Sequence, residues 1–236
     1  FDNLNLDLMF GLPGQTLAEA SADLDALLGL APAHVSYYQL TLEPNTAFHH
    51  APPADVPDED LADDMQQQGL ELLAAAGYGR YEVSAFARPG RRCRHNLNYW
   101  TFGDYIGIGA GAHGKITDAA SGAIFRTSKT RHPRAYIETG QAGKPQGSRH
   151  RLTPGDALLE FAMNVLRLDA GFSMTTFTDN TGLPAAILDE PVARAASAGL
   201  LDTDGGIIRC TDRGRRYLNE LLQYFMTESR HAARHG

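Results

Sequence analysis

The sequence predicts an α/β fold with a parallel sheet, followed by a small helical domain that resembles a winged helix. Strand-like runs at residues 3–10 and 35–42 flank one amphipathic helix, which is the spacing of a βαβ unit. Helical patterns at residues 153–171 and 185–201 precede a short hairpin about Asp204 and Gly205 and a last helix, which is the outline of a winged helix.

The first run, NLNLDLMF, becomes nearly all apolar and predicts a strand buried on both faces. Thr16 and Glu19 fit a capping box at the start of a helix that Pro32 ends. The run VSYYQLTL then predicts a second strand, parallel to the first.

Residues 58–77 begin with acidic side chains and end at a glycine, which predicts a second helix. The next segments are YEVSAF, expected as one short strand, and the glycine-rich GDYIGIGAGAHG at residues 103–114, expected as a strand or turn. Residues 117–147 are polar and basic with little periodicity, so we expect loops that bridge two domains. Pro191 is expected to interrupt the helix at residues 185–201.

The composition is that of a globular protein, with 43% hydrophobic and 21% charged residues. No apolar run approaches the roughly 20 residues of a membrane helix, so we expect no membrane span. We expect no signal peptide, and two cysteines make no disulfide framework, so a reducing cytoplasm is the expected location. Because the first residue is Phe1 and not Met, we expect the chain to be the later part of something longer.

The net charge of −7 is unevenly distributed along the chain. Residues 1–79 contain 13 acidic and no basic residues, whereas residues 80–151 contain 13 basic and 4 acidic ones. A basic middle suggests an anionic ligand there, although arginines also accumulate in solvated loops. The acidic chain as a whole disfavours nucleic acid as the partner.

Two glycine-rich segments fail as phosphate-binding motifs. GLPGQT lacks the lysine of a phosphate loop. GIGAGA matches GxGxxG/A, but a basic turn follows it instead of a helix, so its glycines more plausibly let the backbone approach something flat or bulky. The histidine pairs at residues 49–50 and 231–235 have no third ligand at fixed spacing, and the chain has no cysteine motif for an iron–sulfur cluster.

Asp7 is the only charged side chain in the first strand. A lone acid in a buried strand is costly unless it is paired or binds a ligand. The residues alone leave two alternatives open, a ligand's hydroxyl groups or a structural hydrogen bond to a neighbouring loop.

The stretch RCRHNLNYW, residues 92–100, combines a thiol, an imidazole, arginines and the only tryptophan. His95 could be an axial ligand to heme iron, and Arg92 and Arg94 could hold carboxylates. Tyr99 and Trp100 could cover a flat apolar ring. The alternative is a satisfied histidine in a turn with Trp100 in the core, and residue types alone favour it.

Several stretches in this order resemble a known family. They are NLNLDLMFGLPGQT, HVSYYQLTLEPNTAF, HNLNYW with GDYIGIGAGAHG, and LRLDAGF with AGLLD and CTDRGRRYLNELL. Together they resemble the radical S-adenosylmethionine proteins related to oxygen-independent coproporphyrinogen III oxidase, and HNLNYW fits the HNxxYW motif of the heme chaperone branch. The resemblance implies the C-terminal part of a partial (β/α)6 barrel, starting at its fifth strand, followed by the winged-helix-like domain.

The resemblance also implies domain limits and site residues. Residues 1–116 would be the end of the barrel and the heme or porphyrin side, 117–150 the bridging loops, 151–228 the C-terminal domain and 229–236 a tail. Asp7 would contact S-adenosylmethionine, with Thr41, Ala112 and His113 as weaker lining residues of the same cavity. His95 would lie at the heme or porphyrin, with Arg92, Arg94 and Trp100. The family's CxxxCxxC, which holds a 4Fe-4S cluster, is absent from this chain.

The function implied is a heme chaperone that binds heme and delivers it to acceptor proteins. The alternative is the oxidase itself, in which radical chemistry decarboxylates coproporphyrinogen III, and the basic block would suit that substrate too. A winged-helix nucleic-acid binder is a third possibility, disfavoured by the acidic residues after 151. Because a barrel reduced to its last strands exposes an edge, we expect the isolated chain to be poorly stable.

Overall fold

The computed structural model describes residues 2–143 and 146–226. Contacts divide the chain into two compact units, Phe1–Cys93 and Arg94–Gly236. The predicted domain limits stay a prediction about the whole protein, and the predicted tail lies outside the described residues. Within the described ranges, no helix is both long and apolar enough to cross a bilayer.

The first unit is built on a four-stranded sheet in the order β1-β2-β4-β3. Strands β1 (Asn5–Phe10) and β2 (His34–Gln39) are parallel, as expected, and the helix α1 (Leu17–Gly29) connects them. The predicted capping box is present, since Thr16 accepts from the backbone of Glu19 and the Glu19 carboxylate accepts from the backbone of Thr16.

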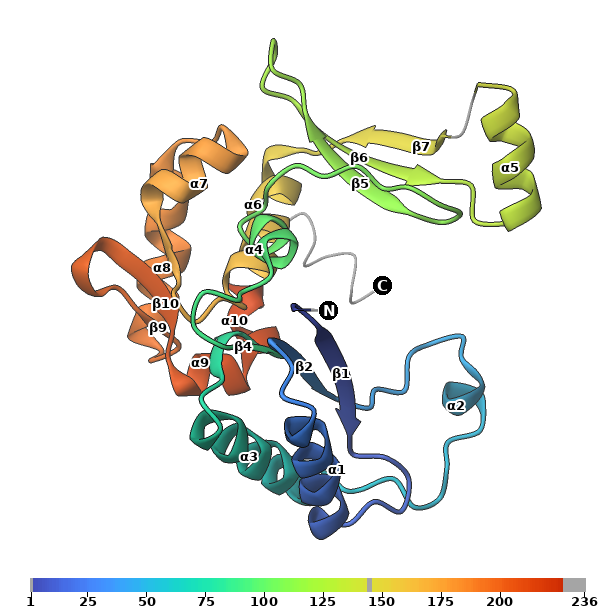
Figure 1. Cartoon of the computed structure of the whole chain (residues 1–236). Helices are drawn as coiled ribbons and strands as arrows, with labels where there is room; N and C mark the ends of the chain where they lie inside the picture. Colours follow the sequence, from blue (N-terminus) through green and yellow to red (C-terminus); the bar gives the residue numbers. More distant parts are fainter. Residues whose placement is uncertain (1, 144–145, 227–236) are drawn as a thin grey trace. The chain divides into compact units, whose positions relative to one another are not determined.

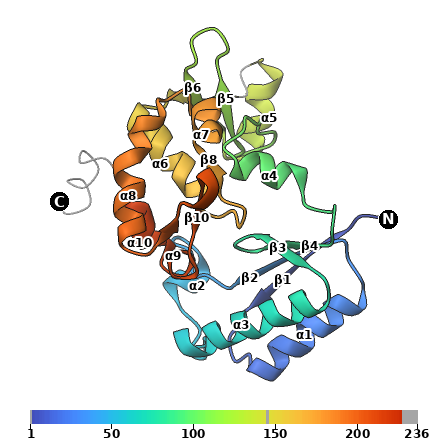
Figure 2. The same cartoon turned by 90° about the vertical axis from the view of Figure 1, so that its left-hand side faces the viewer.

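One face of this sheet is covered by α1 and α3 (Glu59–Ala75), which lie side by side beneath it (Figure 2). Helix α2 (Ala47–His50) is a single turn in the loop that follows β2. The core between sheet and helices contains Phe10, Leu24, Val35, Tyr37, Met65, Leu73 and Phe86. Burial of about ten such side chains at roughly 1.5–3 kcal/mol each is the main stabilising term of this unit.

Two expectations for the first unit are wrong. β1 is not buried on both faces, because Asn5, Asp7 and Met9 alternate with the helix-facing residues and are exposed. YEVSAF is not one strand but the middle of a hairpin, in which β3 (Gly79–Glu82) turns at residues 83–84 into β4 (Ala85–Ala87). Strand β4 then runs antiparallel to β2, so only β1 and β2 follow the parallel pattern.

The second unit begins with α4 (Arg94–Trp100) and continues into an antiparallel sheet (Figure 1). That sheet consists of β5 (His113–Thr117), β6 (Ile124–Lys129) and β7 (Gln146–Arg151), with α5 (Pro133–Gln141) between the last two. The expectation of loops over residues 117–147 is therefore wrong. These strands are polar because much of their surface meets solvent, so they lack the apolar alternation that predicts a strand.

The rest of the second unit has the expected winged-helix outline. It comprises α6 (Pro154–Val165), β8 (Phe172–Ser173), α7 (Met174–Thr181), the 3₁₀ turn η1 (Ala185–Leu188), α8 (Asp189–Ser197), β9 (Leu201–Asp202), the 3₁₀ turn η2 (Asp204–Gly206), β10 (Ile207–Cys210), α9 (Asp212–Arg216) and α10 (Leu218–Gln223). The hairpin at Asp204 and Gly205 is confirmed, with sheet order β8-β10-β9.

Aromatic packing fixes the centre of this unit. The Phe161 ring makes edge-on contacts with Phe102, Phe172 and Phe177 at centroid distances of 6.0, 5.2 and 5.1 Å. The predicted helix at residues 185–201 is interrupted, but the break lies between η1 and α8, after Leu188, and not at Pro191. Pro191 lies buried in the first turn of α8, where a backbone N–H has no intrahelical partner to lose.

Candidate functional site

The HNLNYW motif is a helix and not a turn. His95 is exposed on α4, and Tyr99 is four residues further on, about 40° away around the helix axis and one turn along it. Trp100 is about 140° away from His95 on the same helix. His95 and Tyr99 therefore share a face, whereas Trp100 belongs to another one.

Trp100 lies beneath an arginine. The guanidinium carbon of Arg167 is 4.5 Å from the centre of the Trp100 ring, and the Tyr99 ring meets that ring edge-on at 4.8 Å. Such a cation–π contact contributes about 0.5–2 kcal/mol. Trp100 therefore fixes α4 against its own unit, and it is neither in the core nor beside the imidazole of His95.

The end of α4 is held from several sides. Asn180 donates from Nδ2 to the Thr101 carbonyl at 2.7 Å, and Asn98 donates to the Asp104 carbonyl at 3.0 Å. Phe102, 1% exposed with φ of 64°, turns the chain sharply so that its ring enters the core. His95 is thus presented from a short helix whose C-terminal end is fixed.

The glycine-rich segment 103–114 packs against β5, so its glycines accommodate neighbouring backbone. Tyr105 and Lys115 exchange two backbone hydrogen bonds of 2.9 and 3.0 Å. A Cβ on Gly107 would lie 2.1 Å from the His113 carbonyl oxygen, which no other residue could tolerate. The expected approach to a flat or bulky partner is in this structure an approach to protein backbone.

Two isoleucines on this segment point outward. Ile106 and Ile108 are 75% and 85% exposed, and the Tyr136 hydroxyl accepts from the Gly109 N–H at 3.2 Å. Ala112 is half-buried and His113 is exposed at the start of β5.

A charged network underlies the segment. Arg126 donates to Glu160 at 2.7 Å and to the Tyr105 hydroxyl at 2.9 Å. Burial opposes the charge of Arg126, but the Glu160 carboxylate outweighs burial and raises its pKa. Burial also raises the pKa of Tyr105. This network was not predicted from the sequence, because its members are far apart along the chain.

In the first unit, Asp7 lies on the sheet face opposite the helices and is exposed. Its carboxylate accepts from the Asn5 side chain at 2.7 Å, so the expected costly burial of a lone acid is wrong. Thr41 follows the end of β2, is exposed, and donates to Glu43 at 2.9 Å. Arg92 is exposed, with its guanidinium carbon 5.8 Å from the Tyr81 ring centre.

The structure thus divides the predicted residues between the two units. Asp7, Thr41 and Arg92 belong to the first, and Arg94, His95, Trp100, Ala112 and His113 to the second. Among residues 2–143 and 146–226, no three His, Cys, Asp or Glu side chains gather closely enough to hold a metal ion.

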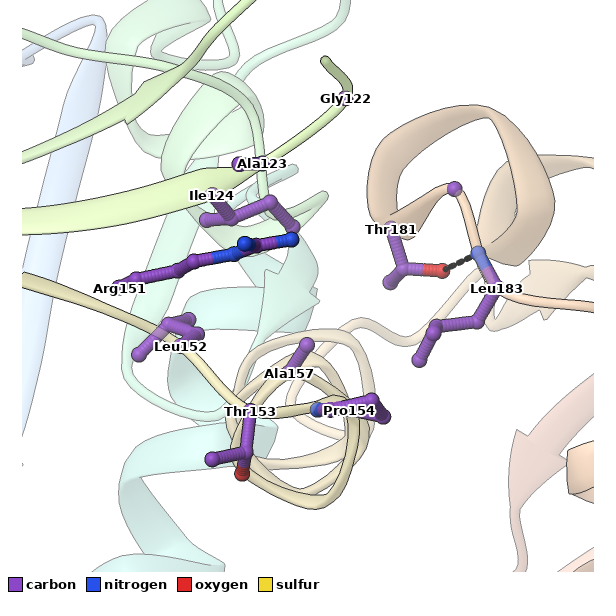
Figure 3. Close-up of a pocket in the computed structure, with 11 residues that line it drawn as sticks. Gly122, Ala123, Ile124, Arg151, Leu152, Thr153, Pro154, Ala157, Thr181 and Leu183 are labelled. Atoms are coloured by element: carbon purple, nitrogen blue, oxygen red, sulfur yellow. Dashed lines mark hydrogen bonds between the residues drawn. The ribbon is translucent and has the colours of Figure 1, made fainter.

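A cavity of about 390 Å³ lies in the second unit, between the ends of β6 and β7 and the helices α6 and α7 (Figure 3). Arg151 contributes its charged side chain, and Ile124, Leu152 and Leu183 contribute apolar walls. None of the predicted site residues lines this cavity.

Comparisons with known proteins find relatives along nearly the whole chain. The model of the HemN C-terminal domain matches residues 152–217. The heme chaperone HemW of Escherichia coli (strain K12) is 46% identical over 226 residues, which are 96% of this chain and 58% of that protein. The heme chaperone HemW of Bacillus subtilis (strain 168) is 32% identical over 233 residues, 97% of this chain and 60% of that protein.

The predicted resemblance is confirmed. This chain is related to the heme chaperones. It spans about 60% of the length of these relatives.

The fold is confirmed separately. A solved structure, titled as the coproporphyrinogen III oxidase (HemN) of Escherichia coli, a radical SAM enzyme, matches with a TM-score of 0.73. The match covers 94% of this chain and 54% of that chain at 21% identity. The chain therefore has the fold of the C-terminal part of a radical SAM barrel and its following helical domain.

Proposed function

We propose that the whole protein binds heme and delivers it to acceptor proteins, and that this chain contains the heme-side residues. The observation that supports this most strongly is the set of relatives named heme chaperones at 32–46% identity along nearly the whole chain. The exposed imidazole of His95 on α4 is the matching structural feature.

In this proposal His95 is the axial ligand of heme iron, a standard role of imidazole. Tyr99 shares its helix face and offers an aromatic surface to the porphyrin ring. Arg94 is its neighbour on α4, and Arg92 lies two residues before the helix, so both are placed in the sequence to pair with propionates. Trp100 acts indirectly, by fixing α4 through Arg167.

We also propose that Asp7 of the first unit contacts S-adenosylmethionine. The Asp7 carboxylate is exposed and already engaged by Asn5 on Oδ1, so a ribose hydroxyl could donate to its other oxygen. Thr41 is a weaker candidate in the same unit, and the weaker assignments of Ala112 and His113, which belong to the second unit, stay predictions. S-adenosylmethionine supplies radical chemistry when it is bound at a reduced cluster.

A 4Fe-4S cluster does not fit the described residues, because they contain no cluster of cysteines or other metal ligands. We therefore assign no cluster ligand to this chain and place the cluster in another part of the whole protein. The described cysteines, Cys93 and Cys210, are free, which agrees with the proposed cytoplasmic location.

The rival function is oxidation of coproporphyrinogen III to protoporphyrinogen IX. It is favoured by the fold match alone, whereas HNLNYW and the curated relatives favour the chaperone. An anaerobic assay of the full-length protein for protoporphyrinogen distinguishes them. Clear turnover would replace the chaperone with the oxidase.

Hemin titration of the full-length protein tests the chaperone. We expect a Soret band for wild type that His95→Ala weakens or shifts. His132→Ala is the matched control, because His132 is an exposed histidine of the same unit whose side chain makes no capping hydrogen bond. Identical spectra and affinities for all three proteins would remove His95 from the site.

A further inference from the structure

The face of the β1–β2 pair opposite α1 and α3 carries a line of polar side chains, exposed at Asn5 and Asp7 and buried at His34. The parallel register places Asn5 beside His34 and Asp7 beside Ser36. Paired residues of adjacent strands point to the same face, so these four side chains share the face that α1 and α3 leave uncovered. These side chains are therefore close enough to form hydrogen bonds with one another.

The hydrogen-bond partners of Asn5 fix the orientation of its side-chain amide. A carboxylate only accepts, so the Asn5 side chain turns its amide nitrogen toward Asp7, at 2.7 Å from Oδ1. The amide oxygen of Asn5 then faces the other way, where it lies 2.6 Å from Nδ1 of His34 and accepts from Ser36 Oγ at 3.2 Å. The reverse orientation of the amide would set two acceptors against each other at Asp7.

The next member is His34, which is 5% exposed. Because Asn5 offers an acceptor, Nδ1 of His34 bears the proton and donates. Nε2 lies 2.8 Å from the Tyr81 hydroxyl, which therefore donates to it in the neutral imidazole. Burial lowers the pKa of His34, while Asp7 and Glu82 oppose that shift. The neutral form of the imidazole is therefore favoured near pH 7.

The last member of the line is Tyr81, a buried residue of β3. Tyr81 is 2% exposed and sits where the β3–β4 register shifts between Arg80 and Glu82, a bulge that turns its side chain. Its ring meets the His34 ring edge-on at 5.6 Å. A rigid, buried phenol thus fixes an imidazole, which fixes an amide, which engages an exposed carboxylate.

We propose that Tyr81, His34 and Asn5 are positioning residues that hold Asp7 in the rotamer that binds the ribose of S-adenosylmethionine. This rests on the proposed role of Asp7. A free aspartate on an exposed strand face would lose rotamer freedom on binding. The series of hydrogen bonds from Tyr81 through His34 and Asn5 to Asp7, called the relay below, fixes the rotamer before the ligand binds. Groups that orient metal-ligating side chains typically change metal affinity or activity by roughly 10–100-fold when they are mutated, and we expect an effect at the lower end of that range for an aspartate that binds a hydroxyl.

The test measures S-adenosylmethionine affinity of the anaerobic, cluster-loaded full-length protein by equilibrium dialysis with labelled ligand. Asn5→Leu, which keeps side-chain size but removes the hydrogen bonds of Asn5 with Asp7, His34 and Ser36, is expected to weaken binding about tenfold. His34→Leu is expected to weaken it several-fold, and His34→Asn, which retains a donor near Nδ1, to restore most of it.

Tyr81→Phe and Tyr78→Phe form a matched pair. Each removes one buried hydroxyl of the first unit, but the Tyr78 hydroxyl donates to the Pro32 carbonyl at 2.6 Å, outside the relay. Both are expected to lower the melting temperature, and only Tyr81→Phe to weaken ligand binding. Histidine ¹⁵N NMR gives a readout independent of ligand, in which the Nδ1–H tautomer of His34 is expected in wild type and is lost or mixed in Asn5→Leu.

Asp7→Asn distinguishes the proposed binding role of Asp7 from the proposed positioning role of Tyr81, His34 and Asn5. If Asp7→Asn binds S-adenosylmethionine like wild type, the proposed role of Asp7 fails and the relay with it. If Asp7→Asn weakens binding while Asn5→Leu, His34→Leu and Tyr81→Phe do not, the role of Asp7 stands and the relay is overturned. Equal effects of Tyr81→Phe and Tyr78→Phe on affinity would also overturn it.

Discussion

The ammonium group of Lys115 lies 2.8 Å from Oδ1 of Asp104, and Lys115 is only 2% exposed. Asp104 also accepts from the backbone and hydroxyl of Thr117, at 2.6 and 2.9 Å. The ammonium lies 4.2 Å from the centre of the Phe102 ring. This pair fixes the glycine-rich segment to β5, directly after the helix that presents His95.

Asp104→Asn is expected to lower the free energy of unfolding by about 2 kcal/mol, because it leaves a buried ammonium without its counter-charge while the exposed side of Asp104 limits the loss. Chemical denaturation of the full-length protein measures the change. Glu138→Gln is the control, since the Arg134–Glu138 pair is exposed and should contribute less than about 0.5 kcal/mol. Similar losses for both variants would show that burial of Lys115 does not matter.

The same pair predicts a dependence on pH. Burial alone would raise the pKa of Asp104, but the hydrogen bonds from Lys115 and Thr117 outweigh it and lower the pKa. A carboxyl whose pKa is lowered on folding stabilises the protein above the unfolded value, about 3.9, and this stabilisation is lost as the pH falls through the folded value. The stability difference between wild type and Asp104→Asn should therefore shrink between pH 6 and pH 3. A constant difference would contradict the charged pair.

Gly107→Ala is expected to destabilise the second unit by at least about 2 kcal/mol, because its Cβ would lie 2.1 Å from the His113 carbonyl oxygen, a backbone atom that cannot move aside. Gly140→Ala in α5 meets nothing within 4 Å and should stabilise by about 0.5 kcal/mol. Thermal unfolding of the two variants compares them. Tolerance of Ala at residue 107 would show that the segment does not pack on β5.

The two thiols are expected to differ in reactivity. Burial raises the pKa of Cys210 to about 11, and its Sγ donates to the Leu166 carbonyl at 3.2 Å, whereas Cys93 is half-buried. Alkylation of native protein at pH 8, followed by mass spectrometry, should modify Cys93 and spare Cys210. Equal modification would indicate that the winged-helix core opens.

Elements with local signals were predictable from the sequence. The capping box of α1, the stripe of α6 and the turn at Asp204 each depend on residues within a few positions of one another. The family resemblance depended on short stretches in order, and the curated relatives confirm it.

Elements fixed by distant pairing were not predictable in the same way. β6 pairs with β7, so that Phe125 lies opposite Arg151, 26 positions later. Neither strand has the regular apolar alternation that would predict it from the sequence. The hairpin at residues 79–87 was missed because its turn, at Val83 and Ser84, contains no glycine, asparagine or proline.

The site was only partly predictable for the same reason. His95 and Asp7 were proposed as site residues from motifs. Asn5 and His34, in contrast, meet only through the parallel register, and Tyr81 joins them only through the bulge in β3. Helical geometry separates Trp100 from His95, which a nine-residue stretch of sequence does not show.

We propose that the imidazole of His95 on α4 binds heme iron. Electron paramagnetic resonance of the ferric heme complex of the full-length protein, with ¹⁵N-labelled histidine, tests it most directly. We predict hyperfine coupling from an imidazole nitrogen in wild type and in His132→Ala, and its loss in His95→Ala. An unchanged coupling in His95→Ala would show that another histidine binds the iron.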